Sequence, residues 1–205
     1  MRARFVRGSD TRLRIIQAAA DLFHKQGVRA TSPDEILEVS RAGKSQFYHY
    51  FKNKEGLVHE VLQWYLQAIK TKTAPLNYEI NSWRDLEEWF LGQVELQKTF
   101  RMTRGCPFGT IGNEVTENDE LIRQDLSLIF EVVKNQLVLF FVKEKAAGRL
   151  VKHADEGRAA DFCISAIQGA MLLSKIKRSS IPAEATVREA MAHLQKYVVV
   201  AKESR

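Results

Sequence analysis

The sequence predicts an all-α fold of about nine helices, on three observations. Apolar residues recur at helical spacing in several long segments. Strand signals are nearly absent, and the nearest one, Val198-Val199-Val200, lies at the end of a helical pattern. The four prolines, at positions 33, 75, 107 and 182, fall between periodic segments. Because proline removes a helix hydrogen bond and clashes with the preceding turn, its absence from the segment interiors favours long helices.

The composition excludes several classes of protein. With 205 residues, 45% hydrophobic and 27% charged, the chain has the balance of a soluble protein with a packed core. No apolar run approaches the roughly 18 to 20 residues of a membrane span, and the basic start lacks the apolar segment of a signal peptide. Two cysteines without metal-ligand spacing predict no disulfide scaffold, no metal and no cofactor, and fit a reducing cytoplasm.

The positive charge is concentrated in the first third. Residues 1–60 hold eleven Lys and Arg against seven Asp and Glu, so they supply +4 of the net charge of +6. Five arginines precede position 15. This pattern is either a solvated terminus or a basic arm beside a nucleic-acid face.

The first helix is predicted from about Thr11 to Gln26, with Thr11 as its cap and Gly27 as its end. Its apolar stripe is Ile16, Ala19, Ala20 and Phe23. Ser32, Pro33 and Glu35 then form the pattern of a capping box that opens a short second helix, which ends before residues 40–43.

A third helix, Lys44 to Phe51, turns Phe47 and Phe51 inward, and Asn53 caps a longer fourth helix that extends to about Lys72. Two short helices joined by a tight turn after a longer first helix form the helix-turn-helix arrangement, in which the second short helix enters the major groove of DNA. The exposed residues of that helix would be Lys44, Ser45, Gln46, Tyr48 and His49. Tyr48 either packs on Phe51 or contacts DNA, and Lys54 with the helix amino terminus would meet a phosphate.

Residues 11–60 resemble the DNA-binding domain of TetR-type bacterial transcriptional regulators. The matching stretches are TRLRIIQAAADLF at 11–23, Gly27, Thr31-Ser32, Ile36, and KSQFYHYFKNKEGL at 44–57. The resemblance implies that Tyr48 and Lys54 hold phosphates, that Ser45, Gln46 and His49 lie near bases, and that Thr31 or Ser32, with Tyr50, line backbone contacts. His49 could instead be a surface histidine without a role in readout.

The turn departs from the family pattern of glycine, a β-branched residue and Ser or Thr, because it reads Arg41-Ala42-Gly43. Either Arg41 adopts a strained turn conformation, or the turn is reshaped, or the glycine role has moved to Gly43.

The remaining two thirds are also predicted to be helical, which divides the chain into a DNA-binding domain at 1–53 and an effector-binding and dimerisation domain at 54–205. The stripes are Leu86, Trp89, Phe90 and Val94; Ile122, Leu126, Ile129, Val133, Leu137 and Phe140; Phe162, Ala166, Ala170 and Leu173; and Val187, Met191, Leu194 and Val198. The resemblance implies that the last two helices pair with those of a second copy, while a wholly intramolecular core is the alternative. A twofold dimer suits two half-sites about 34 Å apart.

The glycine-rich segment 104–114 resembles one that borders an effector cavity in one branch of the family, or it is a simple connector. The expected lining residues are Trp89, Phe108, Asn113, Phe130 and Gln168.

No catalytic motif is present, so we expect no enzyme. The hypothesis is a cytoplasmic homodimeric repressor that a small molecule releases from an operator. The alternatives are a protein-interaction module that no longer binds DNA and a redox-responsive regulator through Cys106.

Overall fold

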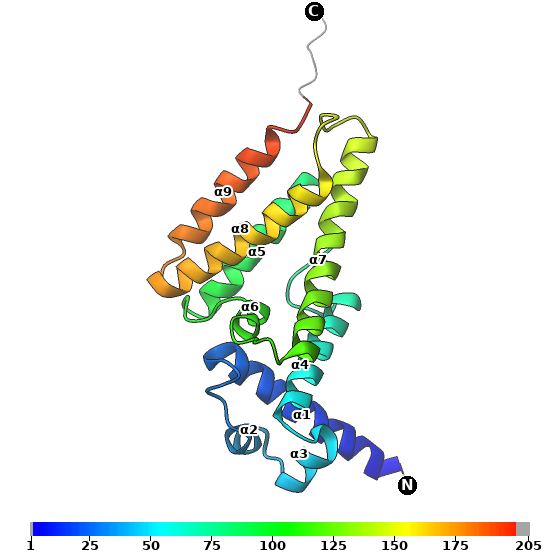
Figure 1. Cartoon of the computed structure of the whole chain (residues 1–205), viewed down its shortest axis with the longest axis vertical. Helices are drawn as coiled ribbons and strands as arrows, with labels where there is room; N and C mark the ends of the chain where they lie inside the picture. Colours follow the sequence, from blue (N-terminus) through cyan, green and yellow to red (C-terminus); the bar gives the residue numbers. More distant parts are fainter. Residues whose placement is uncertain (1, 200–205) are drawn as a thin grey trace, which may run out of the picture. The chain divides into compact units, whose positions relative to one another are not determined.

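The computed structural model describes the backbone of residues 2–199 and the side chains of residues 10–199. Within that range the chain forms nine α-helices and no sheet (Figure 1). They are α1 (Arg2–Gln26), α2 (Pro33–Ser40), α3 (Lys44–Phe51), α4 (Lys54–Lys70), α5 (Trp83–Thr99), α6 (Pro107–Gly112), α7 (Glu120–Ala146), α8 (Glu156–Lys177) and α9 (Ile181–Gln195). The all-helical prediction is confirmed.

The helices group into two compact units. The amino-terminal unit contains α1 to α4, α6 and the part of α7 up to Ile129. The carboxy-terminal unit contains α5, the rest of α7, α8 and α9. The division by packing therefore differs from the boundary expected at residue 53, because α4 packs with α1 and α3, and α6 packs with α1.

The start of α1 differs from the prediction. The helix begins at Arg2, and Thr11 lies inside it, only 6% exposed, instead of capping it. A run with several good helix formers can continue through polar residues, so a local cap signal at Thr11 is overridden. The predicted end is confirmed, since Gly27 has a φ of +88°.

The caps of α2 and α4 agree with the sequence. Ser32 Oγ accepts a hydrogen bond from the Glu35 N–H at 3.1 Å, and Asn53 Oδ1 accepts one from the Gly56 N–H at 2.8 Å. The reciprocal half of the capping box at α2 does not form, because the Glu35 carboxylate accepts hydrogen bonds from Gln26 Nε2 at 2.9 and 3.1 Å.

The long stripes of α5 and α7 are buried as predicted, but that of α8 is not. Phe162 and Leu173 are 36% and 49% exposed. The buried face of α8 is instead Ala160, Cys163, Ile167, Ala170, Met171 and Ser174. Because α8 is apolar almost all round, its periodicity could not select the inward face.

The mean hydropathy of α8 corrects the expectation that no segment is long and apolar enough to span a membrane. Its 22 residues are long and apolar enough, by length and composition, to cross a membrane. The helix still places one face, including Cys163 and Ile167, in the core of the carboxy-terminal unit, and core helices pass the same composition test.

The end of α9 differs from the prediction too. Val198 does not continue the stripe of that helix, which ends at Gln195. It forms an antiparallel bridge with Leu150, which ties the segment after α9 to the loop between α7 and α8.

Candidate nucleic-acid interface

The turn between α2 and α3 is closed by a residue in the left-handed region. Arg41 has φ 52° and ψ 44°; its N–H donates to the Glu38 carbonyl at 3.2 Å, and the Ala42 N–H donates to the Leu37 carbonyl at 3.1 Å. Glycine is common at such positions because an L side chain there costs about 1–2 kcal/mol. The strained alternative is therefore the one that the chain adopts, and Gly43, with φ −89°, does not replace Arg41.

Helix α3 has an anchored face and an exposed face. Phe47 and Phe51 are 1% and 3% exposed and fix the helix on the amino-terminal unit. The predicted readers Lys44, Ser45, Gln46, Tyr48 and His49 are all exposed. Tyr48 is 55% exposed, and its ring meets the edge of Phe47 at 5.3 Å instead of packing on Phe51. One face of α3 thus offers donors, acceptors and an aromatic ring to solvent.

Two of these side chains have local partners. Gln46 Oε1 accepts a hydrogen bond from the Gly43 N–H at 3.0 Å, which leaves the side-chain amide nitrogen as the donor for an outside group. Lys44 Nζ lies 3.1 Å from Asp34 Oδ1, and both side chains are about 70% exposed. An exposed pair of this kind is worth at most about 1 kcal/mol, so Lys44 can exchange Asp34 for a phosphate.

The neighbouring residues expected at the DNA backbone differ in exposure. Ser32 is exposed, whereas Thr31 is completely buried and its hydroxyl donates to the Gly27 carbonyl at 2.7 Å. Of the two alternatives, Ser32 is therefore the one that faces solvent. Tyr50 is half-buried, with its ring 5.2 Å from that of His49.

The start of α4 places free N–H groups and a lysine beside α3. Asn53 caps the helix, and a Cβ at Gly56 would stand 2.2 Å from the Phe51 carbonyl oxygen, so the two helices approach too closely for any other residue. Lys54 is half-buried; burial lowers its pKa, and the Glu114 carboxylate opposes this shift. A helix amino terminus with a lysine is suited to a phosphate.

Two arginines of the charged amino-terminal segment brace this arrangement. Arg12 pairs with Glu60 of α4 and lies over the Phe51 ring at 6.0 Å, and Arg14 Nε donates to the Ser40 carbonyl at 3.3 Å. These two side chains of α1 therefore connect it to α2, α3 and α4. The side chains of the arginines at positions 2, 4 and 7 lie outside the described residues.

Two long-range contacts could not be found in the sequence. The Glu114 carboxylate covers Gly27 and accepts a hydrogen bond from the Arg29 N–H at 2.7 Å. The buried Asp125 of α7 bonds His59 Nδ1 at 2.6 Å and Gln63 Nε2 at 2.7 Å, both on α4. Single carboxylates 60 or more residues from their partners carry no spacing signal.

The residues expected to line an effector cavity are distributed over both units. Trp89 and Phe108 are buried, Phe130 and Gln168 are half-buried, and Asn113 is exposed. Two cavities in the described residues, of about 310 and 360 Å³, are lined by none of the five. The smaller one lies in the carboxy-terminal unit, and the larger one, bordered by Arg29, Lys54 and Glu114, lies in the amino-terminal unit.

Both cysteines are buried, and neither forms a disulfide. Burial raises the pKa of the Cys163 thiol to about 12, so this thiol is held protonated. Cys106 is 8% exposed and precedes α6, a short helix within the glycine-rich segment.

Known families match both parts of the chain. Residues 15–61, which include α2 and α3, match the bacterial regulatory proteins of the tetR family. Residues 86–191, about half of the chain, match the tetracyclin repressor-like C-terminal domain. The chain belongs to the TetR family.

Relatives of this TetR-family protein align along most of its length. An HTH-type transcriptional regulator in the lacX 3′ region of Lactococcus lactis subsp. lactis is 26% identical over 82% of this chain and 84% of its own. The HTH-type transcriptional repressor DhaR of a Mycobacterium species, strain GP1, is 24% identical over 83% and 85%. The crystal structure of a regulatory protein TetR from Rhodobacter sphaeroides covers 91% of this chain and 98% of its own with a TM-score of 0.77 at 23% identity, which shows a shared fold.

Family membership shows the general activity. A TetR-family chain with this helix-turn-helix is a DNA-binding transcriptional regulator and not an enzyme. The matched amino-terminal region contains α3, whose exposed face is therefore the candidate nucleic-acid interface.

Proposed function

We propose that this chain is a homodimeric repressor that binds an operator through α3 and is released by a small molecule. The observation that carries the proposal is the two-sided α3: Phe47 and Phe51 hold it on the amino-terminal unit, and its polar residues face solvent. A helix of this kind after a tight turn is the element that enters the major groove in helix-turn-helix proteins.

Each exposed residue has a proposed role. Gln46, through its free amide nitrogen, together with Ser45 and His49, reads base edges. Lys44, Tyr48 and Lys54, with the N–H groups at the start of α4, hold phosphates, and Ser32 and Tyr50 lie along the DNA backbone. Thr31 is left out, because its side chain is buried.

A second copy is proposed to pack on α8 and α9. Four large aliphatic residues near the turn between these helices are exposed: Leu172 at 48%, Leu173 at 49%, Ile176 at 68% and Ile181 at 71%. Apolar groups clustered in this way are typical of a protein interface. A twofold dimer would present two copies of α3 to successive major grooves.

The response to a small molecule is supported by two buried atoms of α5. Trp89 Nε1 and Gln97 Oε1, on side chains that are 5% and 3% exposed, have no hydrogen-bond partner among the described residues. Each unsatisfied group costs about 1–3 kcal/mol. An effector that accepts from Trp89 and donates to Gln97 would remove both costs. Trp89 was among the lining residues that the sequence predicts.

The proposed repressing sign of regulation is supported by a relative. DhaR, which is similar over most of this chain, is described as a repressor. We propose the same sign here, with the protein acting in the cytoplasm on its operator. Effector binding would tilt α4, which packs with α1 and α3, and so change the distance between the two reading helices.

Selection of duplexes from a random pool tests the proposal. We expect recovery of a palindromic sequence, with Gln46→Ala relaxing the preference at one position by about 1–3 kcal/mol. Tyr48→Ala should weaken binding to selected and random duplexes alike. If Gln46→Ala instead lowers both affinities equally, α3 does not read bases. The recovered duplex then serves to screen small molecules for release.

A further inference from the structure

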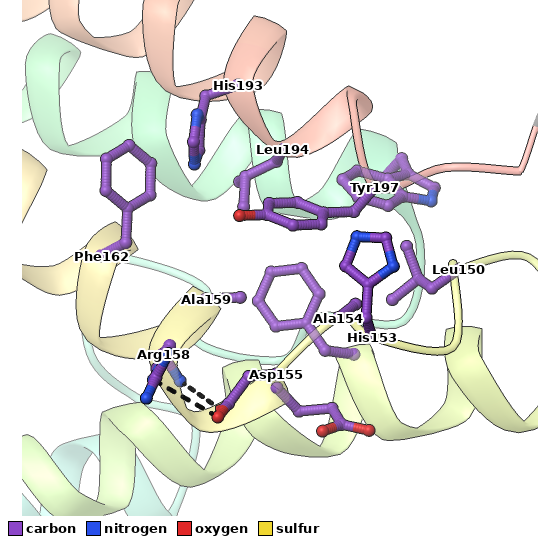
Figure 2. Close-up of a pocket in the computed structure, with 13 residues that line it drawn as sticks. Leu150, His153, Ala154, Asp155, Arg158, Ala159, Phe162, His193, Leu194 and Tyr197 are labelled. Carbon is purple, nitrogen blue, oxygen red and sulfur yellow. Dashed lines mark hydrogen bonds and ion pairs between the residues drawn. The ribbon is translucent and has the colours of Figure 1, made fainter.

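The carboxy-terminal unit has a cavity of about 310 Å³ that lies apart from the two unsatisfied atoms on α5. It is formed where the loop before α8, the start of α8 and the end of α9 meet. Figure 2 shows the labelled side chains around it, with the Tyr197 ring lying across the cavity and its hydroxyl directed toward the side formed by Phe162 and His193. Its volume is in the range of small-molecule sites.

Backbone pairing fixes the walls of this cavity. The Val151 N–H donates to the Tyr197 carbonyl at 2.8 Å, and the Val199 N–H donates to the Arg149 carbonyl at 2.9 Å. Asp155 caps α8 by accepting a hydrogen bond from the Arg158 N–H at 2.9 Å. The Tyr197 and Asp155 sides of the cavity are therefore held in place by hydrogen bonds before any ligand arrives.

Six of the 13 residues that line the cavity carry a ring side chain. The Phe162 and His193 rings are 4.8 Å apart, and those of His193 and Tyr197 are 5.6 Å apart, so the three form a continuous aromatic wall. Trp83 and Phe141 also line the cavity, with ring centres 6.2 Å apart. Phe162 and His193 are exposed, and they lie near the start of α8 and the end of α9, away from the aliphatic residues near the turn between the helices on which the second copy is proposed to pack. A ligand can therefore reach this wall from solvent. Rings at these distances attract a further ring by offset or edge contacts.

The charged groups of the lining already have partners. Glu156 Oε1 lies 3.0 Å from Lys145 Nζ, and Asp155 Oδ2 lies 3.5 Å from Arg158 Nε. In contrast, the Tyr197 hydroxyl has no hydrogen-bond partner within the described part of the chain. A ligand therefore needs no ionic group and gains from a single polar substituent.

We propose that this cavity binds an uncharged, planar aromatic compound that carries a hydroxyl group. The ring would lie against the wall of Phe162, His193 and Tyr197, and its hydroxyl would exchange a hydrogen bond with the Tyr197 hydroxyl. The proposal for this site does not depend on DNA binding. It also does not depend on whether Trp89 Nε1 and Gln97 Oε1 of α5 bind the effector.

Calorimetric titration with 2-naphthol tests the proposal on the full-length protein. We expect one 2-naphthol per chain, and weaker binding of 2-decalol, which has the same substituent on saturated rings. Tyr197→Phe keeps the ring and removes only the hydroxyl, so it should weaken 2-naphthol binding about two- to tenfold, the worth of one hydrogen bond. Phe162→Leu should weaken it by a similar factor through loss of the ring contact.

Tyr78→Phe is the matched control, since it removes the same hydroxyl from a tyrosine outside both the cavity lining and α3 and should leave 2-naphthol binding unchanged. Equal affinity for 2-decalol and 2-naphthol would refute the aromatic preference, and wild-type affinity in Tyr197→Phe would place the ligand elsewhere. Binding that disappears as the protein self-associates would show that a second copy covers the cavity, and this too would overturn the proposal. Duplex binding, measured on the same samples, reports separately on the proposed function.

Discussion

Gly56→Ala is predicted to disrupt the turn that joins the recognition helix to α4. A Cβ at this position would stand 2.2 Å from the Phe51 carbonyl oxygen, where about 3.3 Å is the normal approach of carbon to oxygen. The obstacle is backbone, so no side-chain rotation relieves it. The Asn53 cap, whose oxygen accepts from the Gly56 N–H at 2.8 Å, must move as well.

The net effect follows from three contributions. Overpacking costs about 2 kcal/mol, and a weakened cap costs about 1 kcal/mol. Alanine in place of glycine inside a helix returns about 1 kcal/mol. The free energy of unfolding should therefore fall by about 2 kcal/mol, which lowers the urea midpoint by about 1 M for a slope of about 2 kcal/mol per M.

Gly112→Ala is the matched control in urea unfolding at one protein concentration. Gly112 also lies in a helix, α6, but a Cβ there would meet only Leu126 Cδ1, at an ordinary contact distance of 3.7 Å. It should stabilise the protein by about 0.5–1 kcal/mol. If Gly56→Ala unfolds at the same or a higher urea concentration than the wild type, the reasoning about the α3–α4 turn is refuted.

Three further changes have expected outcomes. Arg41→Gly should raise the free energy of unfolding by about 0.5–1 kcal/mol in urea titrations, because glycine relieves the left-handed conformation; a loss would count against the strain. Trp83→Phe should lower the free energy of unfolding by about 2 kcal/mol more than Trp89→Phe does, as measured by thermal unfolding. The reason is that Trp83 Nε1 donates to the buried Glu144 carboxylate at 2.9 Å, whereas Trp89 Nε1 has no partner among the described residues. Equal losses in the two variants would contradict this. Hydrogen bonds from Arg123 and Gln124 lower the pKa of Glu120 to about 2, so its stabilising effect is present above about pH 4.5 and is lost as the pH falls through about 2. An NMR titration of the Glu120 carboxyl should show this midpoint, and one near 4.5 would exclude the pairing.

Much of the fold follows from local chemistry in the sequence. Ser32 and Asn53 cap the helices they were expected to cap, because a side-chain oxygen before a helix satisfies free N–H groups whatever lies farther away. Phe47 and Phe51 at i and i+4 share one face of α3, and this alone determines which residues of the helix face outward.

Other features depend on contacts that no local pattern encodes. Glu114 covers Gly27 from a segment 87 positions later in the chain, and Thr31 is buried because its hydroxyl meets the Gly27 carbonyl. The exposure of Phe162 on α8 could not be predicted from a helix that is apolar almost all round. The cavity beside Tyr197 requires the bridge between Leu150 and Val198, which a three-residue strand signal does not reveal.

The salt dependence of duplex binding tests the role of α3 and the start of α4 most directly. With the selected duplex, the logarithm of the association constant should fall linearly with the logarithm of salt concentration between about 50 and 200 mM. Lys54→Gln should reduce the slope by about 1 for each copy bound. An affinity that does not change with salt concentration would contradict DNA recognition by this surface and favour a protein-interaction module. The same conclusion would follow if Lys54→Gln left the slope unchanged and the protein bound all duplexes equally.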